Sequence, residues 1–345
     1  MSEQSPLSDA RLGCRRPLSV APMMDRTDRH FRYLCRLMSR EVLLYTEMVT
    51  TGAILYGDKG RHLDFNQGEG PLVLQLGGDD PGALAECAAI AEQWGYDGVN
   101  LNVGCPSDRV QKGSFGAALM RYPERVAAGV RAMRDATQLP VTVKHRIGVD
   151  ELDRYEDMAR FVEIVSESGC DGFTVHARKA WLQGLSPKEN RTIPPLRYEE
   201  VYRLKAEAPE RFIEINGGLR DWPSIEAQLA HVDAVMVGRG FYEEPRLLLE
   251  ADQRLFGSES APPQLSEVVE AMAAYTDRHI AAGGRAHHVT RHLVHLLRRR
   301  PGNQHWRRHL SVEGVRAGAT GDVVREAWGG AEEIAAGVAA RRGLA

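Results

Sequence analysis

The stretch VTVKHRIGVDELDRYEDMARFVEIVSESGCDGFTVHA, residues 141–177, decides the fold of this chain. Two short apolar runs at its ends, Val141–His145 and Gly172–Ala177, predict strands. The apolar periodicity of Arg154–Ser168 between them predicts a helix. Strands that are apolar on both alternating faces and separated by helices are typical of a parallel sheet covered by helices.

The same alternation of strand and helix repeats between about residues 18 and 240. The predicted strands are Leu18–Met23, Val42–Val49, Pro71–Leu76, Gly98–Val103, Val141–His145, Gly172–Ala177, Arg211–Ile215 and Asp233–Val237. The other predicted helices are Thr27–Ser39 with Asp25 as its N-cap, Gly82–Trp94, Glu124–Thr137, Tyr198–Ala208 and Pro223–Ala230, with a weak candidate at Gly52–Gly57. This order predicts an α/β fold, a (β/α)8 TIM barrel. A doubly wound open sheet is the alternative, but no G-x-G-x-x-G turn follows the first strand.

The composition is that of an ordinary globular protein, with 345 residues, 43% hydrophobic residues and a formal net charge of -3. No apolar run approaches the roughly 20 residues that span a bilayer, and the N-terminus has no apolar segment typical of a secretory signal. We therefore expect a cytoplasmic protein with no membrane partner. The five cysteines include no C-x-x-C pair, which predicts free thiols and no metal site.

After about residue 250 the strand pattern stops and helical patterns follow. Residues 257–263 predict a linker, and the helical stretches are Leu265–Ala282, Arg285–Arg299 and a third that begins at Trp306. We therefore expect a flexible N-terminus at 1–16, a catalytic barrel domain at 17–255, a small all-α domain at 262–320 and a loosely packed C-terminal extension at 321–345.

Polar residues occupy the carboxyl ends of the predicted strands, where a barrel of this kind carries its function. Asn216, Gly217 and Gly218 follow the seventh strand, and Gly238 and Arg239 follow the eighth. Loops after these two strands often bind phosphate, so we expect a phosphate-bearing ligand there. Tight turns that happen to need glycine are the alternative.

Lys144 ends the fifth strand, where an ammonium group is costly to bury without an anion or a carbonyl group beside it. It could form a Schiff base or hold the N1/O2 edge of a flavin, and a plain surface lysine is the third possibility. Cys105 lies between Gly104 and Pro106 in the loop after the fourth strand. The alternative for Cys105 is an inert buried thiol, and the alternative for His176 is a structural histidine. A Cys/His hydrolase is disfavoured because no oxyanion-hole motif is present.

The motifs at the strand ends, taken in order, resemble the tRNA-dihydrouridine synthase family. They are Ala21–Met23, Thr46–Met48, Gln75–Gly78, NLNVGCPSDRVQKGSFGAALM at 100–120, VKHRIG at 143–148, TVHAR at 174–178, INGG at 215–218 and VGRG at 237–240. The stretch 177–197, which contains WLQGLS and KENR, resembles the bacterial A type of the family. The resemblance covers about residues 18–320.

The resemblance implies an oxidoreductase that acts on a CH–CH bond, with FMN as cofactor, NADPH as reductant and D-loop uridines of tRNA as substrate, at positions 20 and 20a for the A type. It implies that FMN is held by Pro22, Met23, Met24, Gln75, Lys144, His176, Asn216, Gly217, Gly218, Gly238 and Arg239. It also implies that Cys105 is the general acid and that Asn102 touches the uracil. The chemistry agrees, because a hydride from FMN N5 to C6 must be matched by a proton to C5, which a thiol can donate.

The charge pattern fits an RNA substrate. Residues 280–312 contain seven Arg and six His but no Asp or Glu. Solvated helices usually mix the two signs, so we expect the helical domain to bind tRNA phosphates, with a solvated Arg-rich helix as the alternative. The expected tRNA contacts are Asn102, Arg146, Arg178, Lys188, Arg191, Arg299, Arg300, Arg307 and Arg308, and we expect a monomer.

Three other functions fit part of the sequence. An FMN-dependent barrel oxidoreductase that acts on a small molecule, of the dihydroorotate or enoate type, needs no basic helical tail. A Schiff-base aldolase would use Lys144 without a flavin. A non-enzymatic RNA-binding protein would have no need of an intact Cys105 and Lys144.

Overall fold

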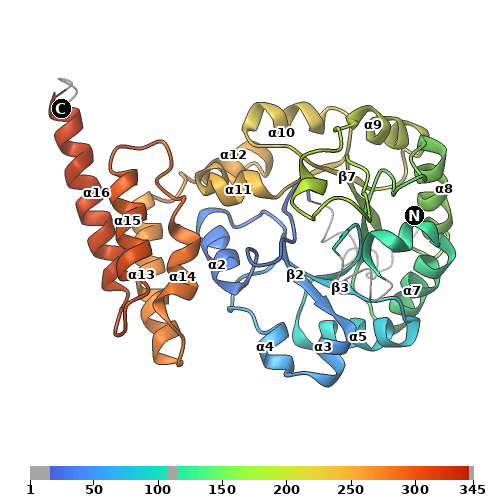
Figure 1. Cartoon of the computed structure of the whole chain (residues 1–345), viewed down its shortest axis with the longest axis horizontal. Helices are drawn as coiled ribbons and strands as arrows, with labels where there is room; N and C mark the ends of the chain where they lie inside the picture. The colour runs from blue at the N-terminus through green and yellow to red at the C-terminus, as the bar shows by residue number, and fades with distance from the viewer. Residues whose placement is uncertain (1–15, 108–114, 342–345) are drawn as a thin grey trace, which may run out of the picture. The chain divides into compact units, whose positions relative to one another are not determined.

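The computed structural model describes residues 16–107 and 115–341, and the predicted flexible segment 1–16 lies almost wholly outside them. Figure 1 shows a barrel of strands with helices around it. All eight predicted strands are present, and they are β1 (Leu18–Val20), β2 (Leu44–Thr50), β3 (Leu72–Gly77), β4 (Gly98–Val103), β5 (Val141–Arg146), β6 (Gly172–His176), β7 (Ile213–Asn216) and β8 (Ala234–Val237).

The sheet closes on itself. Its strands follow the order β1-β8-β7-β6-β5-β4-β3-β2, and each pairs in parallel with its neighbour. The two outer strands also meet, because Ser19 forms a parallel bridge with Leu43 and the amide of Val20 donates to the carbonyl of Leu43 at 2.9 Å. This closure confirms the predicted (β/α)8 barrel.

Local sequence signals set the bounds of the barrel helices, as α5 (Pro81–Trp94) illustrates. Oδ1 of Asp80 accepts from the amide of Ala83 at 2.7 Å, and Gly95 ends the helix with a left-handed φ of 90°. The other helices of the barrel are α3 (Thr51–Tyr56), α4 (Lys59–Leu63), α7 (Pro123–Ala136), α8 (Tyr155–Ser166), α9 (Tyr198–Glu207) and α10 (Trp222–Leu229), with short 3-10 turns η1 (Gly116–Arg121) and η2 (Glu189–Arg191).

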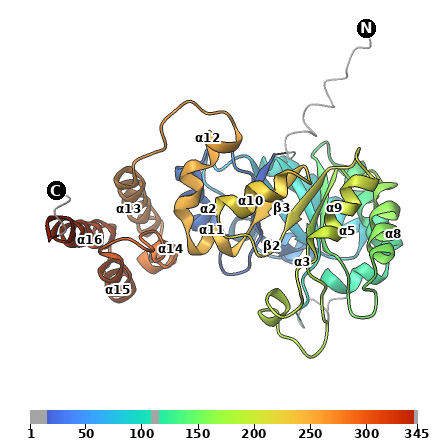
Figure 2. The same cartoon turned by 90° about the horizontal axis from the view of Figure 1, so that it is seen from above.

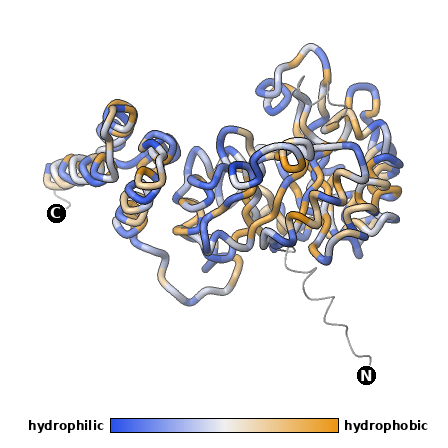
Figure 3. The backbone as a smooth tube through the Cα atoms, turned by 90° about the horizontal axis from the view of Figure 1, so that it is seen from below, coloured by the Kyte–Doolittle hydropathy of each residue, from blue (hydrophilic) through white to orange (hydrophobic). Residues whose placement is uncertain are grey.

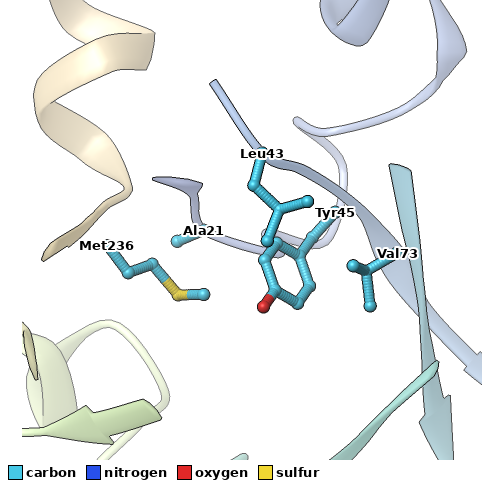
Figure 4. Close-up of a cluster of buried hydrophobic side chains, with 5 residues drawn as sticks. All are labelled: Ala21, Leu43, Tyr45, Val73 and Met236. Atoms are coloured by element: carbon cyan, nitrogen blue, oxygen red, sulfur yellow. The ribbon is translucent and has the colours of Figure 1, made fainter. Parts of the chain in front are cut away.

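Apolar side chains form the wall of the barrel and part of its interior. Figure 3 shows apolar stretches, in orange, alternating with hydrophilic stretches along this part of the chain, and the residues of β1, β3, β7 and β8 are all buried. Figure 4 shows one buried cluster, contributed by β1, β2, β3, β8 and the residues next to them, whose side chains point toward one another: Ala21, Leu43, Tyr45, Val73 and Met236. Their burial stabilises the closed sheet by about 25 cal/mol for each Å² of apolar surface removed from water.

The chain divides into two compact units, a barrel unit (Met1–Thr27 with Val42–Gly238) and a helical unit (Asp28–Glu41 with Arg239–Ala345). The helical unit contains α2 (Arg29–Met38), α11 (Arg239–Glu243), η3 (Pro245–Glu250), α12 (Ala251–Leu255), α13 (Leu265–Ala281), α14 (Ala286–Leu293), α15 (Asn303–Glu313) and α16 (Asp322–Arg341). Helices α13 to α16 lie side by side in Figures 1 and 2. The division differs from the predicted limits of 17–255 and 262–320, because α2 packs against α13 and α14.

Most helix ends differ from the prediction by a residue or more, and α15 begins at Asn303 rather than at Trp306. Two further differences have a visible physical reason. Asp28, not Asp25, caps α2, because Oδ1 of Asp28 accepts from the amide of His30 at 3.0 Å while Asp25 has a φ of 61°. Helix α14 ends at Leu293 and does not continue to Arg299, whose φ of 62° is left-handed.

Residues 322–341 form a packed helix rather than the loosely packed extension expected for 321–345. Helix α16 contacts α13 and α15, and Val324, Ala327 and Ala331 on one of its faces are buried. These residues are spaced by three and four positions, so they form the apolar stripe of an amphipathic helix. Residues 342–345 lie outside the described part of the chain.

Candidate active site

A row of hydrogen-bonded side chains crosses β3, β4 and β5. Nε2 of Gln75 donates to Oδ1 of Asn100 at 2.8 Å, and Nδ2 of Asn100 donates to Oγ1 of Thr142 at 2.9 Å. Oε1 of Gln75 accepts from Nδ2 of Asn102 at 2.8 Å. Because Gln75 and Asn100 are buried and fully engaged, the row holds Asn102 in one orientation at the end of β4.

The side chain of Asn102 in turn positions the loop that carries Cys105. Its Oδ1 accepts from the amide of Gly104 at 3.1 Å and from the amide of Cys105 at 3.0 Å. The amide of Ala117 donates to the carbonyl of Cys105 at 2.9 Å, which ties the other side of the loop. The free thiol of Cys105 is half-buried and lies 3.5 Å from Oγ of Ser107. The chain therefore presents a fixed thiol at the carboxyl end of β4.

Lys144 on β5 lies in a polar but water-poor part of the barrel. Its Nζ donates to Oδ1 of Asn216 on β7 at 3.2 Å. Burial and the charge of Arg146 lower the pKa of Lys144 to about 8, although the charge of Glu214 acts in the opposite direction. Glu214 accepts from Oγ of Ser19 at 2.6 Å, and burial raises its pKa. The amine of Lys144 can therefore bind an anion at the barrel mouth.

Glycines after β7 and β8 bring the backbone close to side chains that the sequence assigns to the same site. Gly217 and Gly218 have φ values of 126° and 77°, which favour glycine. A Cβ on Gly217 would lie 2.9 Å from Cδ2 of His176, and a Cβ on Gly238 would lie 3.2 Å from Sδ of Met23. The end of β7 therefore lies close to the end of β6, and the end of β8 lies close to the segment after β1, so that larger residues would crowd these positions.

Arg146 is predicted to contact tRNA, but the structure places it beneath two loops. Only 3% of the residue is exposed. Its Nε donates to the carbonyl of Gly104 at 2.8 Å, and its Nη1 donates to the carbonyls of Lys179 and Asn190, both at 3.1 Å. Arg146 therefore joins the loop after β4 to the loop after β6, and its guanidinium orients these loops.

The other predicted tRNA contacts fall into two groups. In the loop after β6, Lys188 and Arg191 are exposed, whereas Arg178 donates to the carbonyls of Thr192 and Pro194 and so braces that loop. A second group belongs to the helical unit: Arg299, Arg300, Arg307 and Arg308. Arg239, which is predicted to bind FMN, is the first residue of α11 in the same unit.

Three buried polar residues of the site are not among the residues predicted from the sequence. Each lies two positions before a predicted site residue on the same strand, and strand side chains alternate with a period of two. That spacing is the signal that could have found them: Asn100, Thr174 and Glu214. They matter because Thr174 and Glu214 hydrogen-bond to each other beneath the barrel mouth.

In 16–107 and 115–341, no group of three or more His, Cys, Asp or Glu side chains has the arrangement to hold a metal ion. Cys35, Cys87, Cys105 and Cys170 form no disulfide bond with one another, and Cys14 lies outside these ranges. No helix in the described part of the chain is long and apolar enough to cross a membrane.

Comparisons with known proteins identify the family. Residues 19–326 match the family model described as dihydrouridine synthase (Dus). Relatives named tRNA-dihydrouridine(20/20a) synthase are 56% identical in Synechocystis sp., over 90% of this chain and 93% of theirs, and 53% identical in Escherichia coli, over 90% of each chain. A solved 2-naphthoyl-CoA reductase complex shares the fold, with a TM-score of 0.51 and 11% identity, over 69% of this chain and 50% of that chain. This chain belongs to the dihydrouridine synthase family.

Proposed function

We propose that this protein is a cytoplasmic tRNA-dihydrouridine synthase that reduces the C5–C6 bond of D-loop uridines at positions 20 and 20a, with FMN as cofactor and NADPH as reductant. The observation that carries the proposal is the position of the Cys105 thiol. Asn102 holds it at the end of β4, and Asn102 pairs in register with Lys144 on β5. Membership of the family and the names of the relatives support the proposal.

The residues at the barrel mouth fit a flavin mononucleotide. The close-lying backbone at Gly217, Gly218 and Gly238 is suited to a phosphate group, to which Arg239 would add charge. The amine of Lys144 suits the N1/O2 edge of the ring, where negative charge gathers on reduction. The remaining contacts in this proposal are Pro22, Met23, Met24, Gln75, His176 and Asn216.

The protein side chains then supply the proton and orient the uracil ring. The chemistry that FMN would supply when bound is hydride donation to C6 of the uracil ring. Negative charge develops toward C5 and O4, and Cys105 donates its thiol proton to C5. One N–H of the Asn102 amide is used for Gln75, so the second can be donated to a uracil carbonyl oxygen.

The substrate must reach a recessed site, which favours a loop nucleotide. A uridine has to leave its stack to enter a barrel mouth, and unstacking costs least in an unpaired loop. In this proposal Lys188 and Arg191 contact phosphates near the flipped uridine, while Arg299, Arg300, Arg307 and Arg308 contact the body of the tRNA.

Two measurements test the proposal. The purified protein should be yellow or should take up added FMN, and with NADPH it should form dihydrouridine at positions 20 and 20a of an unmodified tRNA transcript. A transcript with cytidine at both positions is the matched control. A colourless protein that does not bind FMN would contradict the flavin assignment. Flavin reduction by NADPH without any dihydrouridine would instead support an oxidoreductase that acts on a small molecule.

A further inference from the structure

The loop after β6 exposes a tryptophan, which is the most unusual surface residue of the barrel unit. The protein has five tryptophans, all within the described residues, and Trp181 is the only exposed one, with 40% of its surface accessible. Exposed indole surface lowers stability unless it has a partner, since tryptophan is highly buried on average. Figure 2 shows the loop between β6 and α9 projecting from the barrel.

The loop is fixed at the point where it carries this side chain. Oδ1 of Asn190 accepts from the amide of Trp181 at 2.8 Å, and Nδ2 of Asn190 donates to the carbonyl of Trp181 at 2.9 Å. Asn190 is fully buried, and Arg146 donates to its carbonyl. The amide and the carbonyl of Trp181 are therefore both held by Asn190, and neither hydrogen bond involves the indole ring.

The ring is also held in one orientation. Nζ of Lys179 lies 3.9 Å from the centre of the Trp181 ring, a cation–π contact. Lys179 is itself anchored, because its Nζ forms an ion pair with Asp153 at 2.7 Å and donates to the carbonyl of Asp150 at 3.3 Å. Little rotational freedom remains to be lost when a second flat group binds the indole.

We propose that Trp181 is a stacking platform for one unpaired base of the RNA loop that carries the target uridine. This inference rests on the proposed function and adds to it a residue that recognises the substrate. A pre-oriented, half-exposed indole offers a flat apolar surface, and every nucleobase has a complementary π face. The exposed Lys188 and Arg191 of the same loop supply positive charge for the adjoining phosphates.

Three variants test the platform with tRNA transcript, a D-arm stem–loop and a blunt RNA duplex as probes. Trp181→Ala should bind tRNA and the stem–loop about 5-fold to 150-fold more weakly, the range that loss of one stacked base produces, whereas Trp181→Phe should restore most of the affinity. Affinity for the duplex should not change, because its bases are not available for stacking. The slope of log affinity against log salt should stay as in the wild type, since no charge is removed.

Tryptophan fluorescence gives an independent readout. Addition of tRNA should quench the wild type and the control Trp94→Phe, and the quenching should be largely lost in Trp181→Phe. Trp94 is a suitable control because it ends α5, at the opposite end of the barrel from the strand-end loops. Asn190 and Lys179 are unchanged in all variants, so the loop should keep its fold.

The inference is overturned if Trp181→Ala binds the stem–loop like the wild type, if it weakens duplex binding equally, or if quenching persists in Trp181→Phe. Formation of dihydrouridine by the wild type is scored separately. Unchanged stem–loop affinity in Trp181→Ala together with normal dihydrouridine formation would remove the platform and leave the proposed function intact. Loss of quenching in Trp181→Phe with no dihydrouridine in the wild type would retain the platform and remove the function.

Discussion

Cys105 follows β4 and Lys144 lies on the neighbouring strand β5, but the two residues are held in different ways. The thiol of Cys105 is positioned through its own backbone, by Asn102, and it stays half-buried. Lys144 is positioned through its side chain, by Asn216, and it interacts electrostatically with the buried carboxyl group of Glu214. The first arrangement suits a group that must reach a substrate, and the second suits a group that must meet the charge of a bound ligand.

Replacing Cys105 by Ala should reduce dihydrouridine formation by about 10²- to 10⁴-fold, the usual effect of removing a positioned general acid. Flavin content, NADPH oxidation and tRNA affinity should not change, because the loop is held by backbone contacts. Single-turnover assays with tRNA transcript measure the effect. Cys170→Ala, whose thiol lies 3.3 Å from the carbonyl of Gly172 at the start of β6, is the matched control. A near-normal rate in Cys105→Ala would show that the thiol is only structural.

The binding of FMN should depend on pH through Lys144. Its pKa in the ligand-free protein is about 8, below the ordinary value of 10.5, so the amine loses its charge as the pH rises through 8. If the charged amine binds the flavin, FMN affinity should fall by up to about tenfold for each pH unit between 8 and 9.5. Titration of the apoprotein with FMN at several pH values measures this, and Lys144→Met should bind weakly with no such dependence. An identical pH profile in wild type and variant would exclude Lys144 as the responsible group.

At the scale of secondary structure, the carboxylate of Asp28 caps one helix and pairs with side chains of a second helix. Oδ1 of Asp28 caps α2, while its Oδ2 accepts from His292 at 3.0 Å and from Arg291, both on α14. Burial raises the pKa of Asp28, but the hydrogen bond and charge of His292 outweigh it and hold the pKa below its usual range. The contact between α2 and α14 therefore depends on an ionised Asp28.

Asp28→Ala should lower the free energy of unfolding of the helical unit by about 2–5 kcal/mol. Loss of an N-cap costs about 0.5–2 kcal/mol, and loss of charged hydrogen bonds adds about 1.5–3 kcal/mol. Asp80→Ala, which removes only the N-cap of α5, is the control and should cost about 0.5–2 kcal/mol. Urea unfolding followed by circular dichroism compares the two. Equal losses would mean that the pairing with α14 contributes nothing.

Acid should destabilise the same contact. His30 lies between Asp28, Tyr275 and His279, and burial lowers its pKa to about 3 from 6.5, so the folded protein keeps it neutral. Below pH 6.5 the unfolded chain takes up a proton that the folded chain does not, so each further unit toward pH 3 costs about 1.4 kcal/mol of stability. Urea midpoints from pH 7 to pH 5 should fall more steeply in the wild type than in His30→Gln. Parallel curves would contradict the assignment.

At the scale of the whole molecule, the fold supplies the acidic residues that the basic tract 280–312 lacks in sequence. Arg300 lies 3.7 Å from Glu332 of α16, and His309 lies 3.3 Å from Glu326 of the same helix. Arg307 and Arg308 are exposed and form no ion pair within the described part of the chain. The positive charge available for RNA is therefore smaller than the sequence indicates.

Paired substitutions in this tract should distinguish Arg307 and Arg308, which form no ion pair among the described residues, from Arg300, which is paired with Glu332. Each phosphate contact that is lost flattens the plot of log affinity against log salt by about 0.7–0.9. Arg307→Ala with Arg308→Ala should lower the slope for tRNA by about 1.4–1.8, and Arg299→Ala with Arg300→Ala should lower it less, because Glu332 already offsets Arg300. Flavin content and NADPH oxidation should not change. Unchanged slopes in both pairs would mean that the tract is a solvated surface.

The sequence by itself determined the strands, the order of the barrel and the strand ends that carry the site. These features depend on local patterns: apolar periodicity within each element, caps such as Asp80 and Gly95, and short motifs around Asn102 and Asn216. Such patterns can be recognised in the sequence because each involves residues within about one helical turn or one strand. For the same reason they misplaced the start of α2 and the end of α14, where the deciding contacts come from elsewhere in the chain.

Only the tertiary structure decided how these local features act on one another. It closed the barrel through Ser19 and Leu43 and brought the carboxyl group of Glu214 within electrostatic reach of Lys144. It also buried Arg146, an expected tRNA contact, so that its guanidinium joins two loops. It also grouped α2 with α13 and α14 and set α16 against the basic tract. Each outcome depends on burial and on hydrogen bonds between residues far apart in the chain. A buried polar group is stable only where the fold brings a hydrogen-bonding partner to it, and the local sequence does not show that partner.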